Sequence, residues 1–345
     1  MDARAERFCE LPWAYAGLVA LPVVALFLCE GLIAWLGQQP NVPDACLVCY
    51  AQPASTGGGG NATRWLEASA RMRLLAMFAL FFIFSAAVIA KFWSDLSRLF
   101  ANPARFRVVV AYGLGVGAAA VVVVSAYVRG GLPRAMDMLG CGTFVEALGM
   151  AASFGGGPWG GCAFDRLLDV TNVVAGFTIP AFVAGGISCL ARSARQDALE
   201  KENWTYQAER LKTYIYMSTA FLVLGVLYFA TWTGYPSFAL SPEARPAFEA
   251  AVNAFTMYTG IEYSIILAAY ALPVAWIVSR RADRIAAHIA AEECGHEAVV
   301  PLSALKEIRE REGLAFSTSD TVKAVLALLA PLITGTLPSL TAAVG

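Results

Sequence analysis

Long apolar runs alternate with short polar segments along this 345-residue chain. A helix that crosses about 30 Å of hydrocarbon needs roughly 17–25 consecutive apolar residues. Six runs meet this requirement, at residues 13–36, 74–93, 108–128, 170–190, 214–233 and 254–278. The pattern therefore predicts an all-α fold, a polytopic integral membrane bundle with six transmembrane helices.

A seventh apolar run, at residues 324–340, is shorter and contains Pro331, Gly335 and Pro338. Its length leaves three alternatives open: it spans the membrane, re-enters it, or lies in the interface. The first run is too long for a signal-peptide core and is interpreted as a retained anchor. We expect a transmembrane bundle over 1–278, a cytoplasmic helical region over 279–323 and a hydrophobic segment over 324–345.

Positive charges give the expected orientation. With the N-terminus in the cytoplasm, 18 of the 25 lysine and arginine residues fall in cytoplasmic segments. Lysine and arginine are enriched on the cytoplasmic side of membrane proteins. The chain is therefore predicted to be a multi-pass protein of a bacterial inner (plasma) membrane, with a cytoplasmic N-terminus and exterior loops at about 37–73, 129–169 and 234–253.

The composition agrees with a membrane protein and excludes several other classes. The chain is 58% hydrophobic and 15% charged, whereas soluble domains carry about 25% charged residues. A net charge of −1 argues against nucleic-acid binding. The two histidines, His288 and His296, both lie outside the spans, which argues against a haem held by two histidines. No catalytic constellation and no metal site is predicted.

Four of the eight cysteines fall in two exterior loops. Cys46 and Cys49 form a Cys-x-x-Cys pair in the first loop, and Cys141 and Cys162 lie in the second. Thiols in the bacterial periplasm tend to be oxidised. We expect disulfide bonds that brace these periplasmic loops, and the sequence leaves the choice among three pairings open.

The same cysteines carry one resemblance. A Cys-x-x-Cys-Tyr between spans one and two, with a second pair between spans three and four, resembles the quinone-coupled disulfide-generating oxidoreductases of bacterial inner membranes. The resemblance covers about the first 190 residues. It implies that Cys46 and Cys49 are the quinone-proximal pair, and that Cys141 and Cys162 exchange with a periplasmic partner. Quinone would then be the cofactor.

Two carboxyl groups, Glu30 and Glu262, lie inside predicted spans. Ionisable residues within a membrane are costly and often functional. One interpretation is that both line a polar cavity, as part of a cation path or a ligand site. The alternative is that they are protonated or interfacial carboxyls bonded to neighbours such as Tyr263 or Thr259.

Small residues and a basic cluster complete the candidate features. Gly113 and Gly117 have the spacing that lets helix backbones touch, within one chain or between copies. Gly185 and Gly186 add a second small patch. The basic cluster of Arg280, Arg281 and Arg284 either senses a cytoplasmic ligand or acts as an ordinary positive-inside signal.

Three functions are compatible with these features. The first is a homo-oligomeric ion channel or pore-type effector without a cofactor, whose cytoplasmic helical layer responds to a regulatory ligand or protein partner. The second is the quinone-coupled thiol–disulfide oxidoreductase. The third is an accessory or sensor subunit of a larger membrane complex. Because mid-span charges are scarce, we favour a channel or pore over a pump or enzyme.

Overall fold

The structure is a computed structural model. It describes residues 9–36, 60–99, 102–128, 139, 141–153, 162–193, 200–294, 302–314 and 318–344. The short elements are β1 (Cys9–Glu10), α1 (Trp13–Ala16), the 3-10 helices η1 (Gly17–Val19) and η3 (Tyr235–Ala239), and β2 (Arg192–Ser193). The longer helices are α2 (Ala20–Leu36), α4 (Gly60–Ser97), α5 (Asn102–Val128), α7 (Cys141–Ser153), α8 (Cys162–Ser188), α9 (Glu200–Thr233), α10 (Arg245–Cys294), α11 (Leu302–Arg311) and α12 (Thr318–Val344).

The predicted all-α fold is confirmed for the described part of the chain, where a single two-residue strand pair, β1 with β2, is the exception. Five helices, α4, α5, α8, α9 and α10, are long and apolar enough to cross a membrane. The first and last predicted runs contain shorter apolar stretches, at 13–29 and 323–336. Helices α9 and the 50-residue α10 extend well beyond their apolar runs into the polar sequence.

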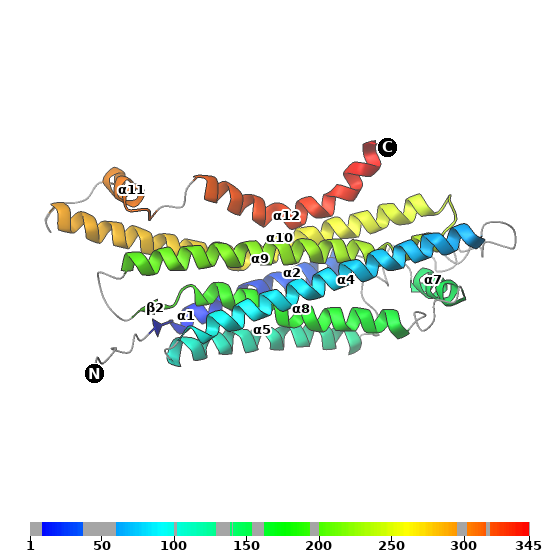
Figure 1. Cartoon of the computed structure of the whole chain (residues 1–345), viewed down its shortest axis with the longest axis horizontal. Coiled ribbons are helices and arrows are strands. Elements are labelled where there is room, and N and C mark those ends of the chain that lie inside the picture. Colours follow the sequence, from blue (N-terminus) through cyan, green and yellow to red (C-terminus); the bar gives the residue numbers. More distant parts are fainter. Residues whose placement is uncertain are drawn as a thin grey trace.

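The long helices lie lengthwise in one elongated bundle (Figure 1). One end carries β1, β2 and α11, and we call it the α11 end; the other carries α7 and is called the α7 end. The helix termini that the sequence assigns to the cytoplasm lie together at the α11 end (Figure 1). The up-and-down order of the five long helices is therefore as predicted. The count of six or seven spans and the side that faces the cytoplasm stay predictions.

The outer surface of the bundle is apolar over much of its length. In the most hydrophobic stretches of α4 and α5, only 22% and 17% of the residues are buried within the chain. Ile83 on α4 and Leu114 on α5 are 65% and 62% exposed. Such large apolar surfaces do not remain in contact with water in soluble monomers. Lipid accounts for them, and we conclude that this is a multi-pass membrane protein.

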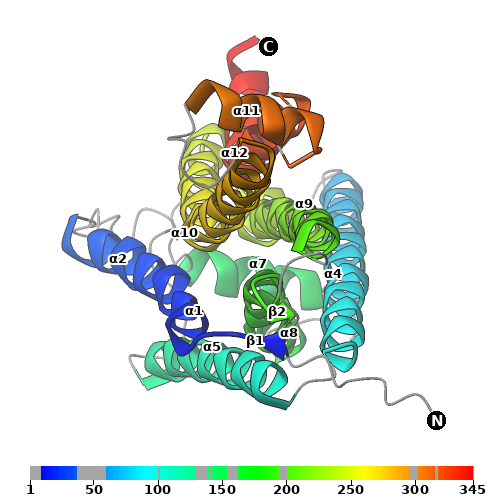
Figure 2. The same ribbon diagram turned by 90° about the vertical axis from the view of Figure 1, so that its left-hand side faces the viewer.

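Helix α8 lies near the centre of the bundle, between α4, α5 and α9 (Figure 2). Its last two turns are buried, and glycines there admit aromatic rings from the neighbouring helices. A Cβ atom on Gly185 would stand 2.1 Å from the Tyr214 ring, and one on Gly186 would stand 3.0 Å from the Tyr270 ring. The expected close helix contact at this glycine pair is confirmed.

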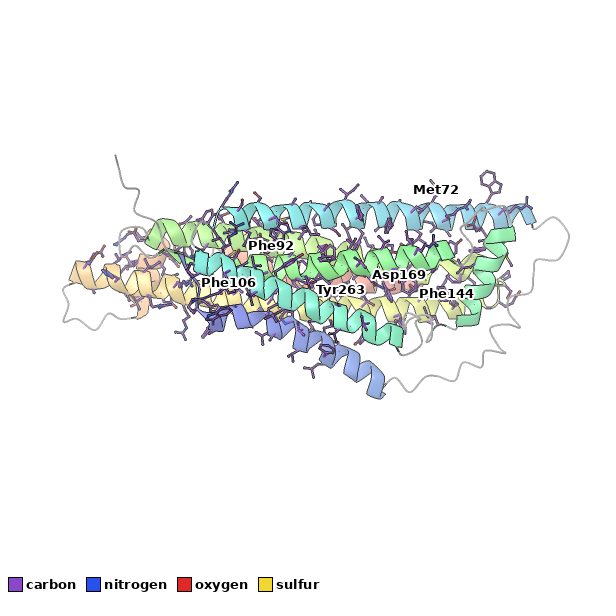
Figure 3. All side chains as sticks on the ribbon, turned by 90° about the horizontal axis from the view of Figure 1, so that it is seen from below. Met72, Phe92, Phe106, Phe144, Asp169 and Tyr263 are labelled. Carbon is purple, nitrogen blue, oxygen red and sulfur yellow. The ribbon has the colours of Figure 1, made fainter. Side chains whose placement is uncertain are left out.

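The α7 end has a core of its own, where the sequence predicted only an exterior loop at about 129–169. Helix α7 lies across this end and buries Phe144, Ala147, Leu148 and Ala151 (Figure 3). These positions follow the spacing of one helix face, so the segment forms an amphipathic helix rather than an extended loop. They pack with η3 and with the first turns of α8 and α10.

Helix α12 packs along α10 and bends where the two helices meet (Figure 1). A Cβ atom on Gly260 of α10 would stand 2.5 Å from the Pro331 carbonyl oxygen, and one on Gly335 of α12 would stand 2.7 Å from the Thr256 oxygen. The Leu332 backbone N–H donates to the Ser264 hydroxyl at 3.2 Å. Pro331 and Gly335, which make this run a weak candidate for a span in the sequence, therefore lie where α12 packs closely on α10.

Candidate functional site

A cavity of about 250 Å³ lies inside the bundle and has Glu262 in its wall. It is bounded by η1, α2, α5, α8 and α10. Tyr263, the neighbour of Glu262 and also a lining residue, lies near the middle of the bundle's length (Figure 3). We call this space the Glu262 cavity.

Close packing of α5 on α8 forms one wall of the cavity. Gly115 of α5 faces Pro180 of α8, and a Cβ atom on the glycine would stand 2.9 Å from the proline Cβ and 3.5 Å from a methyl group of Val19. A side chain at position 115 would therefore displace the proline or enter the cavity. A Cβ atom added to Gly113 or Gly117 would meet nothing within 4 Å in the described part of the chain. The close contact of α5 with α8 is therefore made at the intervening glycine, Gly115.

Glu262 itself is 8% exposed. The remaining wall is mainly hydrocarbon and includes Val19, Leu26, Phe27, Val122, Ile179 and Ile266. Among the lining residues that the structure describes, Glu262 alone carries a carboxyl group, and none is a lysine or an arginine. A carboxylate in such surroundings attracts a positive charge more strongly than it would in water, because the effective dielectric constant is lower.

Glu30, the second predicted intramembrane carboxyl, is carried by α2 next to the same part of α10. The Tyr258 hydroxyl of α10 donates to the carbonyl oxygen of Cys29 at 2.8 Å. Tyr258 precedes Glu262 by one helical turn. The structure therefore brings the two helix segments together, while the Glu30 side chain lies outside the described part.

The wall of the cavity reaches the outer surface of the bundle at α2. Phe27 of α2 is one of the lining residues and is 47% exposed. In a bilayer this part of the outer surface faces the hydrocarbon, so the cavity is accessible from the side of the bundle.

A second polar site, a buried charge cluster, lies toward the α11 end. Asp95 of α4 accepts hydrogen bonds from Arg210 Nε at 3.1 Å and from the Tyr214 hydroxyl at 3.0 Å, and it forms an ion pair with Lys91. The Asp95 and Arg210 side chains are only 3% and 6% exposed. Breaking such a pair on one side leaves an uncompensated buried charge, so this cluster ties α4 firmly to α9.

The sequence does not reveal the Asp95 cluster. Both of its basic residues count among the positive charges of the cytoplasmic side, and positions 95 and 210 are 115 residues apart. The available signal is the acidic residue itself, two positions beyond the predicted end of span two, among basic neighbours. A lone acidic residue at a cationic membrane boundary is a candidate for pairing.

The three candidate sensing arginines occupy different surroundings. Arg281 is 6% exposed and donates to Gln207 Oε1 at 2.9 Å and to the Leu190 carbonyl oxygen at 2.6 Å. It therefore joins α10 to α9 and to the segment that directly follows α8. Arg280 is exposed, with its guanidinium 5.4 Å from the Trp276 ring centre, and Arg284 is exposed as well. Ligand sensing stays a prediction for the two exposed arginines.

The four exterior cysteines are only partly covered by the structure. Cys46 and Cys49 lie outside the described residues. Cys141 and Cys162 begin α7 and α8, and their side chains lie outside the described part as well. Cys29 and Cys189 are buried, and Cys189 is a free thiol. The predicted disulfides and the redox pairs of the oxidoreductase hypothesis therefore stay predictions.

The described residues contain no group of three or more histidine, cysteine, aspartate or glutamate side chains that could hold a metal ion. No protein-family profile, no curated protein and no solved structure matches this chain. Its class, a multi-pass helical membrane protein, rests on the helices themselves. Any narrower function must be argued from the Glu262 cavity and the buried charge cluster.

Proposed function

We propose that this protein moves cations across the membrane and that Glu262 is the group that binds them. The observation that carries the proposal is a buried carboxyl group in the wall of a cavity, at mid-bundle depth (Figure 3). A charged residue at the centre of a bilayer disfavours insertion by about 2.5–3.5 kcal/mol, so a purely structural position would favour an apolar residue.

The proposal refines the predicted ion channel. The cation site lies within one chain, so each copy in a homo-oligomer would carry its own site. The exposed glycines Gly113 and Gly117 support association of copies through α5, because small residues let membrane helices approach closely. The role of the α11 layer and of the exposed Arg280 and Arg284 would be regulatory.

Cation flux into liposomes tests the proposal. The purified full-length protein is reconstituted into vesicles with an inside-negative potential, and uptake of radioactive Rb⁺ and of a monovalent organic ammonium ion is measured. The decisive variant is Glu262→Gln, which keeps the shape and removes the charge. Its matched control is Glu249→Gln, because Glu249 is an exposed carboxyl on the same helix.

We expect Glu262→Gln to lower the flux of at least one of these cations by about tenfold or more, which corresponds to about 1.4 kcal/mol. Glu249→Gln should stay within about twofold of the unaltered protein, a difference of less than about 0.5 kcal/mol. Size-exclusion chromatography of each variant verifies folding. Equal flux through all three proteins, or flux no greater than that of empty vesicles, would refute cation transport through Glu262.

A further inference from the structure

The described walls of the Glu262 cavity offer few side-chain oxygen atoms to a small metal cation. Hard cations such as Ca²⁺ take about six to eight oxygen ligands, and K⁺ filters replace the hydration shell with rings of carbonyl oxygens. The described lining offers the Glu262 carboxyl and the Tyr263 hydroxyl, and the other lining side chains are alanine, valine, leucine, isoleucine, proline, phenylalanine and glycine. These described groups would replace only a few of the water ligands that a dehydrated metal ion loses.

An organic cation with an apolar body fits these walls better than a metal ion does. Its charge is spread over alkyl or aryl groups, so it loses little hydration when it leaves water. Its body can bury apolar surface against residues such as Leu26, Val122 and Ile266 at about 25 cal/mol per Å². Its charge can lie beside Glu262, where the low dielectric constant strengthens the attraction.

The size and the opening of the cavity fit the same class of ligand. The volume of about 250 Å³ lies just below the range of drug-sized ligand sites, about 300–1,000 Å³, so it suits a small organic ion. The half-exposed lining residue Phe27 brings the cavity wall to the lipid-facing surface. An amphipathic cation partitions into this region of a bilayer, whereas a hydrated ion does not.

We infer that the ligand of the Glu262 cavity is a lipophilic organic cation, such as an alkyl- or arylammonium ion, which enters sideways from the hydrocarbon at α2. The inference rests on the proposed function for the role of Glu262. It adds the chemical class of the ligand and its route of entry. It assigns the carboxylate to charge recognition and the hydrocarbon walls to recognition of the body.

Equilibrium dialysis with radiolabelled phenyltrimethylammonium tests the ligand class, on the purified full-length protein in detergent. Its uncharged isostere, tert-butylbenzene, is the matched ligand control for partition into the micelle. Glu262→Gln removes the charge of the site, and Glu249→Gln is again the matched control variant. Ala118→Leu narrows the cavity from the α5 side, since Ala118 lines it.

We expect the unaltered protein and Glu249→Gln to bind phenyltrimethylammonium in a saturable manner. Glu262→Gln should weaken this binding by about tenfold or more, equivalent to about 1.4 kcal/mol. Binding of tert-butylbenzene should be the same in both carboxyl variants. Ala118→Leu should weaken binding of the organic cation while the α-helical content and elution volume of the protein stay unchanged.

The possible failures separate the two proposals. If Rb⁺ flux depends on Glu262 and phenyltrimethylammonium binding does not, the lipophilic-cation inference is wrong and cation transport stands. If phenyltrimethylammonium binds in a Glu262-dependent manner without any cation flux, the ligand class stands and transport is wrong. Absence of both effects in folded protein would overturn both. If Glu262→Gln fails to fold, Glu262→Asp is measured in the same dialysis. Its shorter side chain moves the carboxylate away from the cavity. This variant must bind phenyltrimethylammonium more weakly for the inference to hold.

Discussion

Replacing Gly185 by alanine should disrupt the junction of α8, α9 and α4, because no space exists there for a methyl group. The added Cβ atom would stand 2.1 Å from Cε1 and 2.3 Å from Cζ of Tyr214. Both distances are far below van der Waals contact, so the ring must move. The same ring carries the hydroxyl group that donates to Asp95 at 3.0 Å.

The magnitude follows from opposing contributions. Overpacking a well-packed interior destabilises a protein by about 1–3 kcal/mol. Loss of a hydrogen bond to a charged group removes about 1.5–3 kcal/mol more. Alanine is the better helix former by about 1 kcal/mol, which offsets part of this loss. We therefore expect Gly185→Ala to lower the free energy of unfolding by about 2–4 kcal/mol.

Reversible unfolding in mixed detergent–dodecyl sulfate micelles, followed by circular dichroism, measures this change. The matched control is Gly113→Ala on α5, where nothing lies within 4 Å of the new methyl group, and it should be neutral or slightly stabilising. In a Tyr214→Ala background, Gly185→Ala should lose most of its effect, because the clashing ring is gone. If Gly185→Ala is as stable as Gly113→Ala, the packing of Tyr214 described above is wrong.

Three further predictions concern other contacts. Asp95→Asn should destabilise the protein by about 3–5 kcal/mol, because it leaves the Arg210 charge buried. Asp283→Asn removes a half-exposed ion pair and should cost under about 1 kcal/mol. The same unfolding assay measures both changes, and equal losses of stability would contradict the burial argument. Gly113→Leu should reduce the oligomeric mass seen by native mass spectrometry without changing monomer stability, and a monomeric unaltered protein would refute association through α5. Gly335→Val should loosen α12 from α10, because a Cβ atom meets the Thr256 carbonyl oxygen at 2.7 Å; hydrogen exchange should rise over residues 318–344, and unchanged protection would disprove this contact.

Five of the spans and their order could be predicted because the bilayer imposes a length and a composition on each helix. The positions of α4, α5, α8, α9 and α10 agree with runs of about 20 apolar residues. Long-range pairing could not be predicted in this way. Asp95 and Arg210 meet only because α4 and α9 pack side by side, and no local pattern encodes that neighbourhood.

The Glu262 cavity was only half predictable. A carboxyl inside a span marks Glu262 as a candidate, because such residues are rare and costly. The walls depend on which glycine of α5 faces α8. The sequence favoured Gly113 and Gly117, whereas Gly115, two positions away and on the other side of the helix, makes the contact with Pro180.

The distribution of polar and close contacts along the bundle explains why the middle can hold a ligand. At the α7 end, an aromatic core closes the bundle, and the Tyr235 hydroxyl donates to Glu67 at 2.9 Å. At the α11 end, the Asp95 cluster and Arg281 join α4, α9 and α10 and the segment that follows α8. Between these two fixed regions, the cavity remains. Substitutions at the two ends should therefore change stability first, whereas substitutions in the cavity wall should change ligand binding at nearly constant stability.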